Sequence, residues 1–284
     1  MKDLMIGEIV SMLRKNKNMT LKETTNSQFS ESQLARFEKG ETELTISKFH
    51  LILDNLNIFL DEFQSISHNW SGKPHGHFRA ELAQAYATKD SKRLKTLLDT
   101  CWQQTQTEPS KKSHRLNYLV VRCILASAQQ SAVIKEDILE LTDYLRSVDE
   151  WGRYEIWIFG NCLHFFDKKM LDYYGQYILG RTNFYQSIHL NKQMVIRTIL
   201  NIINTLLSRS EPVKALKYIQ HLENMVIPID FFYEKILLKY HKARYSYLSG
   251  NIASKKDMIA CAETIETYGF REEAALLYHE INQL

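Results

Sequence analysis

Apolar residues along this chain recur every three or four positions, which is the spacing of one face of an α-helix. The first such set lies near the N-terminus and consists of Leu4, Ile6, Ile9, Val10 and Leu13. It predicts a helix over about residues 4–15. From about Lys73 onward no stretch shows the period-two alternation of a half-buried β-strand. The pattern therefore predicts an all-α protein.

Capping signals divide the residues that follow. Thr20 with Glu23 three positions later has the form of a capping box, so a short helix is expected over about residues 21–26. Ser30, with Gln33 at the corresponding position, predicts a helix over about residues 31–39 that ends at Gly40. Two short helices with a tight connection between them are the plan of a helix-turn-helix domain.

Two more helices complete this N-terminal unit. Thr45 opens a fourth helix, whose apolar residues extend to Leu56. A fifth is expected from Leu60 to Ile66. We interpret residues 1–67 as a DNA-binding domain and residues 68–73 as a linker.

The remainder, residues 74–284, has a regular pattern of helix-rich blocks. They begin near Pro74, Ser113, Trp151, Asn191 and Asp230, at steps of 38 to 40 residues. That regularity predicts stacked helical hairpins of the tetratricopeptide kind. Two apolar stripes are expected to be core: Ile199, Leu200, Ile203, Leu206 and Leu207 form the first, and Phe232, Ile236, Leu237, Tyr240 and Tyr247 the second.

The composition narrows the class of protein further. Hydrophobic residues make up 44% and charged residues 24% of the chain, as in ordinary folded proteins. No N-terminal pattern resembles a signal peptide, and no apolar run reaches the roughly 18 residues that cross a bilayer. The four cysteines show no zinc-site spacing. We therefore expect free thiols, a cytoplasmic location and no membrane partner.

Catalytic and metal-binding motifs are missing from the sequence. His68, His75 and His77 lie close together, but we interpret them as part of a solvated linker rather than as a metal site. None of the nucleophile, zinc-protease, phosphate-loop or dinucleotide motifs occurs. No metal and no cofactor are expected, and an enzyme is the least favoured class.

Charge and helix geometry together locate the expected DNA contacts. Residues 1–70 hold eight Lys/Arg and ten Asp/Glu, so a uniformly basic domain is excluded and a local patch is required. In the helix after Ser30, Gln33 and Arg36 share a face with Ser32, and such side chains read adenine and guanine. The predicted DNA-binding residues are Arg14, Lys15, Lys22, Ser30, Ser32, Gln33, Arg36 and Lys39. The alternative is that Gln33 only caps its helix and Arg36 is only solvated.

The segment Ser32-Gln33-Leu34-Ala35-Arg36-Phe37-Glu38-Lys39-Gly40-Glu41 and the trailing residues 53–63 resemble the Rgg-type regulators (Rgg/MutR family) of Gram-positive bacteria. These belong to the repressor-like helix-turn-helix class. The turn at residues 26–29 departs from that class because it lacks a glycine. The resemblance implies a structural ion pair between Arg14 and Glu38, which gives Glu38 a stabilising role and Arg14 a mixed one.

The resemblance continues more loosely into the repeats. Trp151-Gly152-Arg153-Tyr154-Glu155-Ile156 through Phe159-Gly160-Asn161 is similar to a segment of the same family, as is the helix around Asn201. It implies a homodimer that binds a short signalling peptide in its concave groove. The expected peptide-binding residues are Arg153, Tyr154, Asn161, Tyr185, Arg197, Asn201 and Asn204. For Asn161 and Asn201 hydrogen bonding between stacked helices is the equal alternative, and Glu155 is expected to pair with a cation.

The sequence thus predicts a peptide-responsive transcription regulator whose partners are double-stranded DNA, a short peptide and a second copy of the chain. The alternative is a helical-repeat scaffold that binds a protein partner, with DNA binding secondary.

Overall fold

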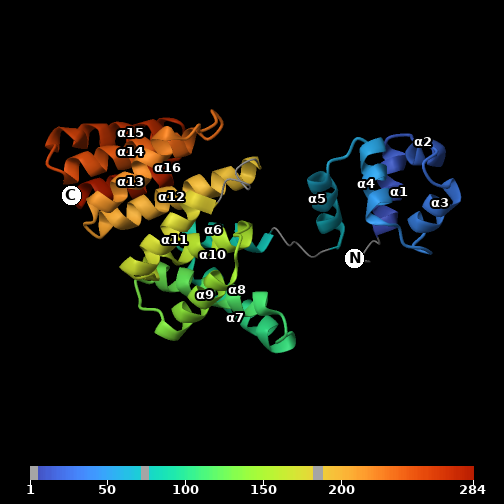
Figure 1. The fold of residues 1–284 in the computed structure, drawn as a ribbon, viewed down its shortest axis with the longest axis horizontal. Coiled ribbons are helices and arrows are strands. Elements are labelled where there is room, and N and C mark those ends of the chain that lie inside the picture. Colours follow the sequence, from blue (N-terminus) through green and yellow to red (C-terminus); the bar gives the residue numbers. More distant parts are fainter. Residues whose placement is uncertain (1–5, 72–76, 182–187) are drawn as a thin grey trace. The chain divides into compact units, whose positions relative to one another are not determined.

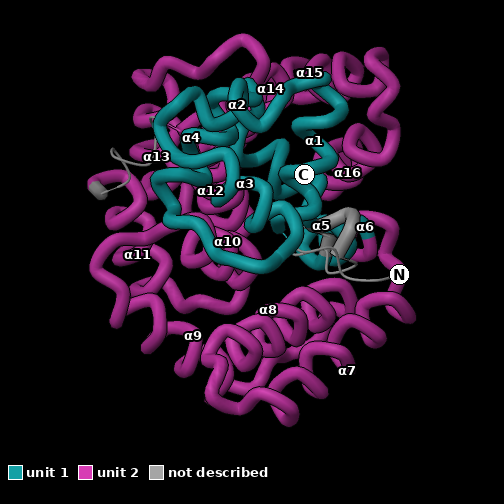
Figure 2. Tube along the Cα trace, turned by 90° about the vertical axis from the view of Figure 1, so that its right-hand side faces the viewer, with its two compact units in different colours: residues 1–84 teal, residues 85–284 magenta. Residues whose placement is uncertain are grey.

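The computed structural model describes residues 6–71, 77–181 and 188–284. Every regular element in these ranges is helical, as the periodicity predicts. Contacts between Cα atoms divide the chain into two compact units, residues 1–84 and 85–284 (Figures 1 and 2).

The first unit contains five helices that close around one apolar core. They are α1 (Ile6–Asn16), α2 (Leu21–Thr25), α3 (Glu31–Glu38), α4 (Ile46–Asn55) and α5 (Leu60–Ser71). The core is made of Ile9, Val10, Leu13, Leu34, Phe37, Ile52, Leu53, Leu56, Ile58 and Phe63. The last turn of α5 therefore occupies residues 68–71, where the sequence predicts the start of a linker. A sixth helix, α6 (His77–Ala87), crosses the boundary between the units.

The capping residues occur where the sequence places them. The Thr20 side chain accepts a hydrogen bond from the Glu23 amide, and the Glu23 carboxylate accepts one from the Thr20 amide, which completes a capping box. Ser30 and Thr45 accept hydrogen bonds in the same way at the starts of α3 and α4. After α2 the chain turns at Asn26, whose φ of 44° lies in the left-handed region. Asparagine tolerates this conformation, so the turn forms without a glycine.

The second unit is an array of helical pairs. They are α8 (Lys112–Ala128) with α9 (Lys135–Ser147), α10 (Arg153–Cys162) with α11 (Lys168–Arg181), α12 (His189–Ser208) with α13 (Pro212–Asn224), and α14 (Phe232–Leu248) with α15 (Lys255–Thr267). Helix α7 (Ser91–Thr107) precedes them, α16 (Arg271–Asn282) follows, and short 3₁₀ turns cover Leu163–Phe165 and Ile252–Ser254. The first helices of the pairs begin within three residues of the predicted block starts, so the repeat prediction is confirmed.

Successive repeats contact each other through their first helices, since α8 packs on α10, α10 on α12, and α12 on α14. Helix α12 lies within this stack, and its predicted apolar stripe is buried throughout. The second predicted stripe is different. Only Tyr240 is fully buried, Phe232 is 52% exposed, and the other three side chains are half-buried. Tyr240 belongs to a buried core, and Ile236, Leu237 and Tyr247 pack against it. The prediction of a core stripe in α14 is therefore confirmed for these four residues and wrong for Phe232, because a periodic apolar face is buried only where another helix covers it.

Candidate functional site

Helix α3 is held against the rest of the first unit by an ion pair to α1. The Arg14 guanidinium donates from Nε and Nη2 to the two Glu38 carboxylate oxygens, each at 2.7 Å, and from Nη1 to the Met19 carbonyl at 2.8 Å. The side chains are only 11% and 8% exposed. The Glu38 hydrogen bond raises the pKa of Arg14. The Arg14 guanidinium thus holds α3 in place through its hydrogen bonds, which is the structural role that the resemblance implies.

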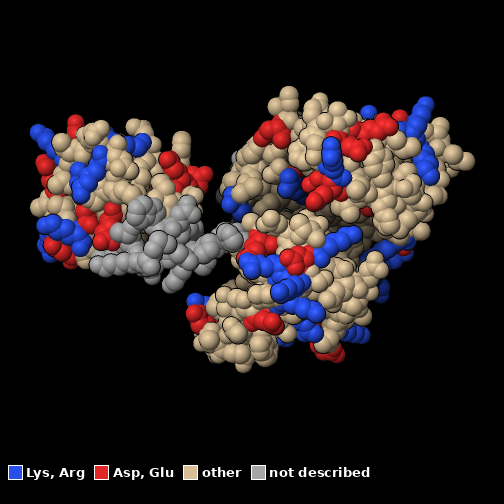
Figure 3. Space-filling model, turned by 180° about the vertical axis from the view of Figure 1, so that it is seen from behind, with Lys and Arg blue, Asp and Glu red and all other residues tan. Residues whose placement is uncertain are grey.

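The remaining predicted DNA-binding residues lie at the surface of α1, α2 and α3, and all of them except the half-buried Gln33 are exposed. Arg36 is 61% exposed and has only a loose contact of 3.7 Å with exposed Glu41. Ser30 and Ser32 are exposed beside each other, with their hydroxyl oxygens 3.3 Å apart. Lys15, Lys22 and Lys39 are also exposed. Figure 3 shows Lys/Arg and Asp/Glu side chains mixed on the visible face of this unit, in agreement with a local rather than a uniform basic surface.

Gln33 makes a contact that the sequence did not predict. Its backbone amide donates to the Ser30 hydroxyl, but its side chain does not reach back to complete a capping box. Instead Gln33 Oε1 accepts a hydrogen bond of 2.7 Å from Lys48 Nζ of α4. Lys48 also lies 5.6 Å from the Phe29 ring centroid. The structure thus adds Lys48 to the surface around α3. In the sequence, the position of Lys48 in the first turn of the predicted fourth helix was the only sign of this role.

In the second unit, several of the predicted peptide-binding side chains join neighbouring repeats. Arg153 donates to Asn191 of α12, and the Tyr154 hydroxyl donates to Asn117 Oδ1 of α8 at 3.0 Å. Asn204 Oδ1 accepts a 2.6 Å hydrogen bond from Arg244 of α14.

Two other motif residues bond locally. Asn161 donates to the Trp157 carbonyl of its own helix at 2.7 Å, rather than to a neighbouring helix. Glu155 was expected to pair with a cation, and the structure shows otherwise. Its carboxylate accepts hydrogen bonds from the Gly152 amide and the Tyr144 hydroxyl. It caps α10 instead. Tyr185 falls outside the described residues.

Arg197 and Asn201 are the two predicted residues that line a common cavity, of about 520 Å³. Asn201 is exposed, and Arg197 Nε donates to the buried Glu234 carboxylate at 2.5 Å. The cavity lies where α12, α14 and the start of α16 meet, and its other lining residues are Leu200, Tyr233, Leu237, Phe270 and Glu273. Burial first, and the Glu273 carboxylate next, raise the pKa of Tyr233.

Only Arg197 and Asn201 of these lining residues were predicted as a binding site, and Leu200 and Leu237 were predicted as core. A signal was present, because Tyr233 and Leu237 follow Arg197 and Asn201 by 36 residues in the next repeat. Helices α12 and α14 are equivalent in successive repeats, so these pairs face the same space. The cavity is therefore lined by one cation (Arg197), one anion (Glu273), one amide (Asn201) and apolar side chains.

A family model described as the C-terminal domain of the HTH-type transcriptional regulator Rgg matches residues 100–280, which is more than half of the chain. The chain belongs to the Rgg family of transcription regulators. Rgg is not a class of enzyme, and no helix among the described residues is long and apolar enough to cross a membrane.

Solved structures agree with this membership. The Streptococcus dysgalactiae SHP pheromone receptor Rgg2 is 25% identical, with a TM-score of 0.78, over 98% of this chain and 99% of that chain. A variant of that receptor is 27% identical, with a TM-score of 0.76, over 99% and 98%. PrgX in complex with iCF10 shares the fold at 15% identity, with a TM-score of 0.72 over 97% and 94%.

Proposed function

We propose that this Rgg protein binds operator DNA as a homodimer through α3 and that a short signalling peptide in the cavity of α12, α14 and α16 controls that binding. The observation that supports DNA binding is the outer surface of α3, where Ser30 at the N-cap, Ser32 in the first turn and Arg36 in the last turn are exposed. Arg14 and Glu38 fix the helix from its inner side. A helix of this kind presents its N-terminal residues to base edges in the major groove.

The proposed DNA contacts divide by role. Arg36 reads a guanine, and Gln33 reads an adenine once Lys48 turns to a phosphate. Ser30, Ser32, Lys15, Lys22 and Lys39 contact the sugar–phosphate backbone. We leave Arg14 out of this set because its guanidinium is directed inward. One such unit makes few contacts, so two copies are needed for tight specific binding, and a cytoplasmic location gives them access to the chromosome.

The peptide half rests on the chemistry of the cavity and on the relatives. Rgg2 is described as a pheromone receptor, and PrgX was solved with iCF10. An amide such as Asn201 satisfies peptide backbone groups, Leu200, Leu237 and Phe270 take apolar side chains, and Arg197 attracts a carboxylate. We retain residues 1–67 as the DNA-binding part and 74–284 as the part that dimerises and senses. Residues 68–73 join them, and the last turn of α5 takes up 68–71 of this segment.

The DNA assignment is tested with a genomic fragment that the full-length protein retains from host DNA. We expect Arg36→Ala to weaken binding about tenfold or more, since one bidentate base contact contributes roughly 1–3 kcal/mol. Lys95→Ala on α7, an exposed residue of the other unit, is the matched control and should bind as the wild type does. Equal affinities for all three proteins, measured by fluorescence anisotropy, would remove α3 from the interface.

The sensor assignment is tested by calorimetry with a peptide that the wild-type protein captures from host culture. Asn201→Ala and Tyr233→Ala should each weaken peptide binding, while Gln220→Ala on exposed α13 should leave it unchanged. The cavity is not the sensor if the peptide binds both cavity variants as tightly as it binds Gln220→Ala.

A further inference from the structure

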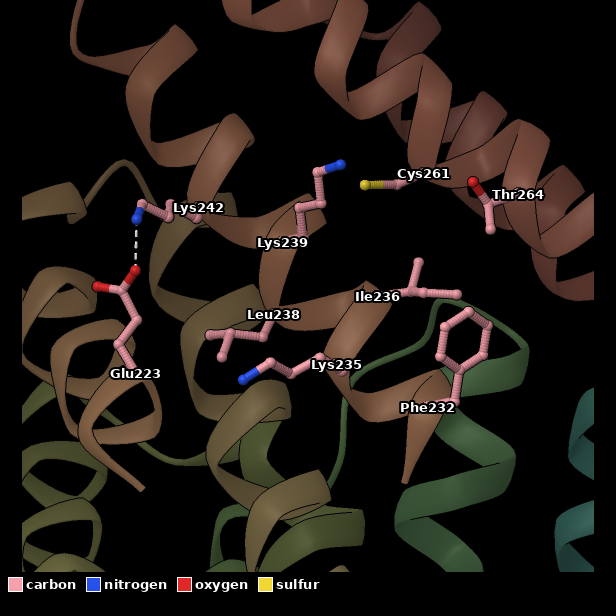
Figure 4. Close-up of a pocket in the computed structure, with 9 residues that line it drawn as sticks. All are labelled: Glu223, Phe232, Lys235, Ile236, Leu238, Lys239, Lys242, Cys261 and Thr264. Carbon is pink, nitrogen blue, oxygen red and sulfur yellow. Dashed lines mark hydrogen bonds and ion pairs between the residues drawn. The ribbon is translucent and has the colours of Figure 1, made fainter. Parts of the chain in front are cut away.

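A second cavity in the repeat unit lies between α13, α14 and α15, apart from the one proposed for the peptide. It has a volume of about 550 Å³ and is shown in Figure 4. We call it the lysine groove and define it by Glu223, Phe232, Lys235, Ile236, Leu238, Lys239, Lys242, Cys261 and Thr264. Helix α14 contacts both α13 and α15, so α14 forms the floor and the other two helices form the walls.

The inner surface of the lysine groove, on α14 and α15, is apolar. Leu238 and Cys261 are buried, Ile236 is half-buried, and Phe232 is 52% exposed at one end. The Phe232 ring meets the Tyr268 ring edge to face at 5.9 Å, and Tyr268 is itself 66% exposed. Ile229, in the turn that leads into α14, is 94% exposed. Apolar side chains that lie together at a surface in this way mark an interaction site.

Three lysines line the lysine groove along α14, at positions 235, 239 and 242. Steps of four and three residues put them on one side of the helix, in a row about 10 Å long at 1.5 Å rise per residue. Lys242 forms an ion pair with Glu223 of α13, as Figure 4 shows. Within the part of the chain that the structure describes, Lys235 and Lys239 have no carboxylate partner. The groove therefore combines uncompensated positive charge with an apolar floor.

We propose that the lysine groove binds an acidic amphipathic helix of a partner protein. A helix with carboxylates at i, i+4 and i+7 repeats the spacing of the lysines, and apolar residues on the adjoining stripe reach the floor. This is the helix-in-groove mode of recognition. A second copy of the chain is a poor occupant, because two such grooves face to face would bring the lysines together and like charges repel.

This proposal does not rest on the assignment of α3 or of the peptide cavity, since none of the residues that define the groove belongs to either site. If it holds, the repeat unit has a second binding surface besides the peptide cavity. The regulator can then bind another protein while a peptide occupies that cavity.

The test uses the full chain and a fluorescein-labelled synthetic helix of about 15 residues. The peptide carries Glu at i, i+4 and i+7 and Leu on the adjoining stripe. We expect saturable binding by anisotropy that weakens as salt is raised. A matched peptide with Gln in place of Glu should bind roughly tenfold more weakly or worse, because it has lost the charge complementarity.

Two protein variants alter the lysine groove in different ways. Lys235→Glu with Lys239→Glu reverses its charge, and Thr264→Trp fills the space between α15 and the floor without changing charge. Each should weaken peptide binding by about tenfold or more. The control, Lys92→Glu with Lys95→Glu, makes the same charge change on exposed α7 and should bind as the wild type does. Circular dichroism verifies that each variant remains folded.

Three results would overturn the proposal. One is binding of the acidic peptide that neither groove variant weakens relative to the α7 control. Another is equal binding of the Glu and Gln peptides. The third comes from sedimentation. If the protein with Lys235→Glu and Lys239→Glu assembles to a lower mass than the wild-type protein does, the groove is an interface between copies of this chain.

Discussion

At the residue scale, the position of α3 depends on one almost buried ion pair, Arg14 with Glu38. Removal of one partner from such a pair leaves the other charge buried and unpaired, which costs more than the pair itself contributes. Arg36 and Glu41 form the opposite case, because both are exposed and 3.7 Å apart. Exposed pairs contribute little to stability. The two pairs lie in the same unit and differ both in burial and in the distance between their charged atoms.

We predict that Glu38→Ala destabilises the first unit by about 3 kcal/mol. Its matched control, Glu41→Ala, should change stability by no more than about 0.5 kcal/mol. Hydrogen exchange of the amides in α1 and α3, followed by mass spectrometry of the full chain, separates the two variants. If both variants exchange at the same rate, the Arg14–Glu38 pair does not hold α3.

A second residue-scale prediction concerns His241 of α14, which is buried. Burial, and then the Arg244 charge, lower its pKa to about 3 from an ordinary value near 6.5. Between these values the unfolded chain binds a proton that the folded chain does not, so stability is lost as pH falls below about 6.5.

His241→Phe should therefore flatten the dependence of stability on pH between about 6 and 4, relative to the wild type. The expected difference approaches tenfold in the unfolding equilibrium constant per pH unit. Urea unfolding at a series of pH values measures it. Parallel pH profiles for the two proteins would show that His241 is not the group that titrates.

The sequence predicted some of these residue contacts and not others. The caps at Thr20 and Ser30 were predictable because each depends on residues three positions apart. Lys48 and Gln33 are 15 residues apart, and only the packing of α4 beside α3 brings them together. The family resemblance predicted the ion pair of Arg14 with Glu38. It did not predict the third hydrogen bond of Arg14, which goes to the Met19 carbonyl and so also keeps the guanidinium inside the unit.

At the element scale, α1 and α3 approach so closely that only glycine fits at the crossing. A Cβ atom on Gly7 would lie 1.9 Å from the Phe37 carbonyl oxygen. Gly180, in the last turn of α11, has no atom within 4 Å of the corresponding position. The same substitution should therefore have opposite effects at the two sites.

We predict that Gly7→Ala forces α1 away from α3, destabilises the first unit by roughly 1–3 kcal/mol and weakens DNA binding. Gly180→Ala should instead stabilise its helix by about 0.5–1 kcal/mol, because alanine loses less backbone entropy than glycine. Thermal unfolding and the anisotropy assay measure both. A Gly7→Ala protein with wild-type stability would contradict the close crossing.

Helix existence and repeat length were predictable at this scale, because period and breakers are local properties of the sequence. The partial exposure of the apolar stripe of α14, which is greatest at Phe232, was not. Its apolar stripe has the same period as that of α12, but α12 is enclosed by its neighbours whereas the stripe of α14 lines two cavities. The sensor cavity was found only in part for the same reason, since Phe270 and Glu273 reach it from the turn before α16 and from α16.

At the scale of the whole molecule, the proposed DNA and peptide sites lie in different compact units. A peptide then controls DNA binding only by favouring one state of the protein over another, and the coupling is reciprocal. We predict that the captured peptide changes the dissociation constant for operator DNA by a factor of roughly 5–150, and that DNA changes the dissociation constant for the peptide by the same factor. Anisotropy and calorimetry measure the two factors. A peptide that binds without any effect on DNA affinity would separate sensing from regulation.

The most direct test of the account is protection of guanine N7 in the captured operator from dimethyl sulfate. If α3 lies in the major groove, wild-type protein protects a guanine in each half-site, and Arg36→Ala removes that protection while the protein remains bound at higher concentration. A bound wild-type protein that leaves every guanine N7 reactive, or protection that survives Arg36→Ala unchanged, would contradict the central claim.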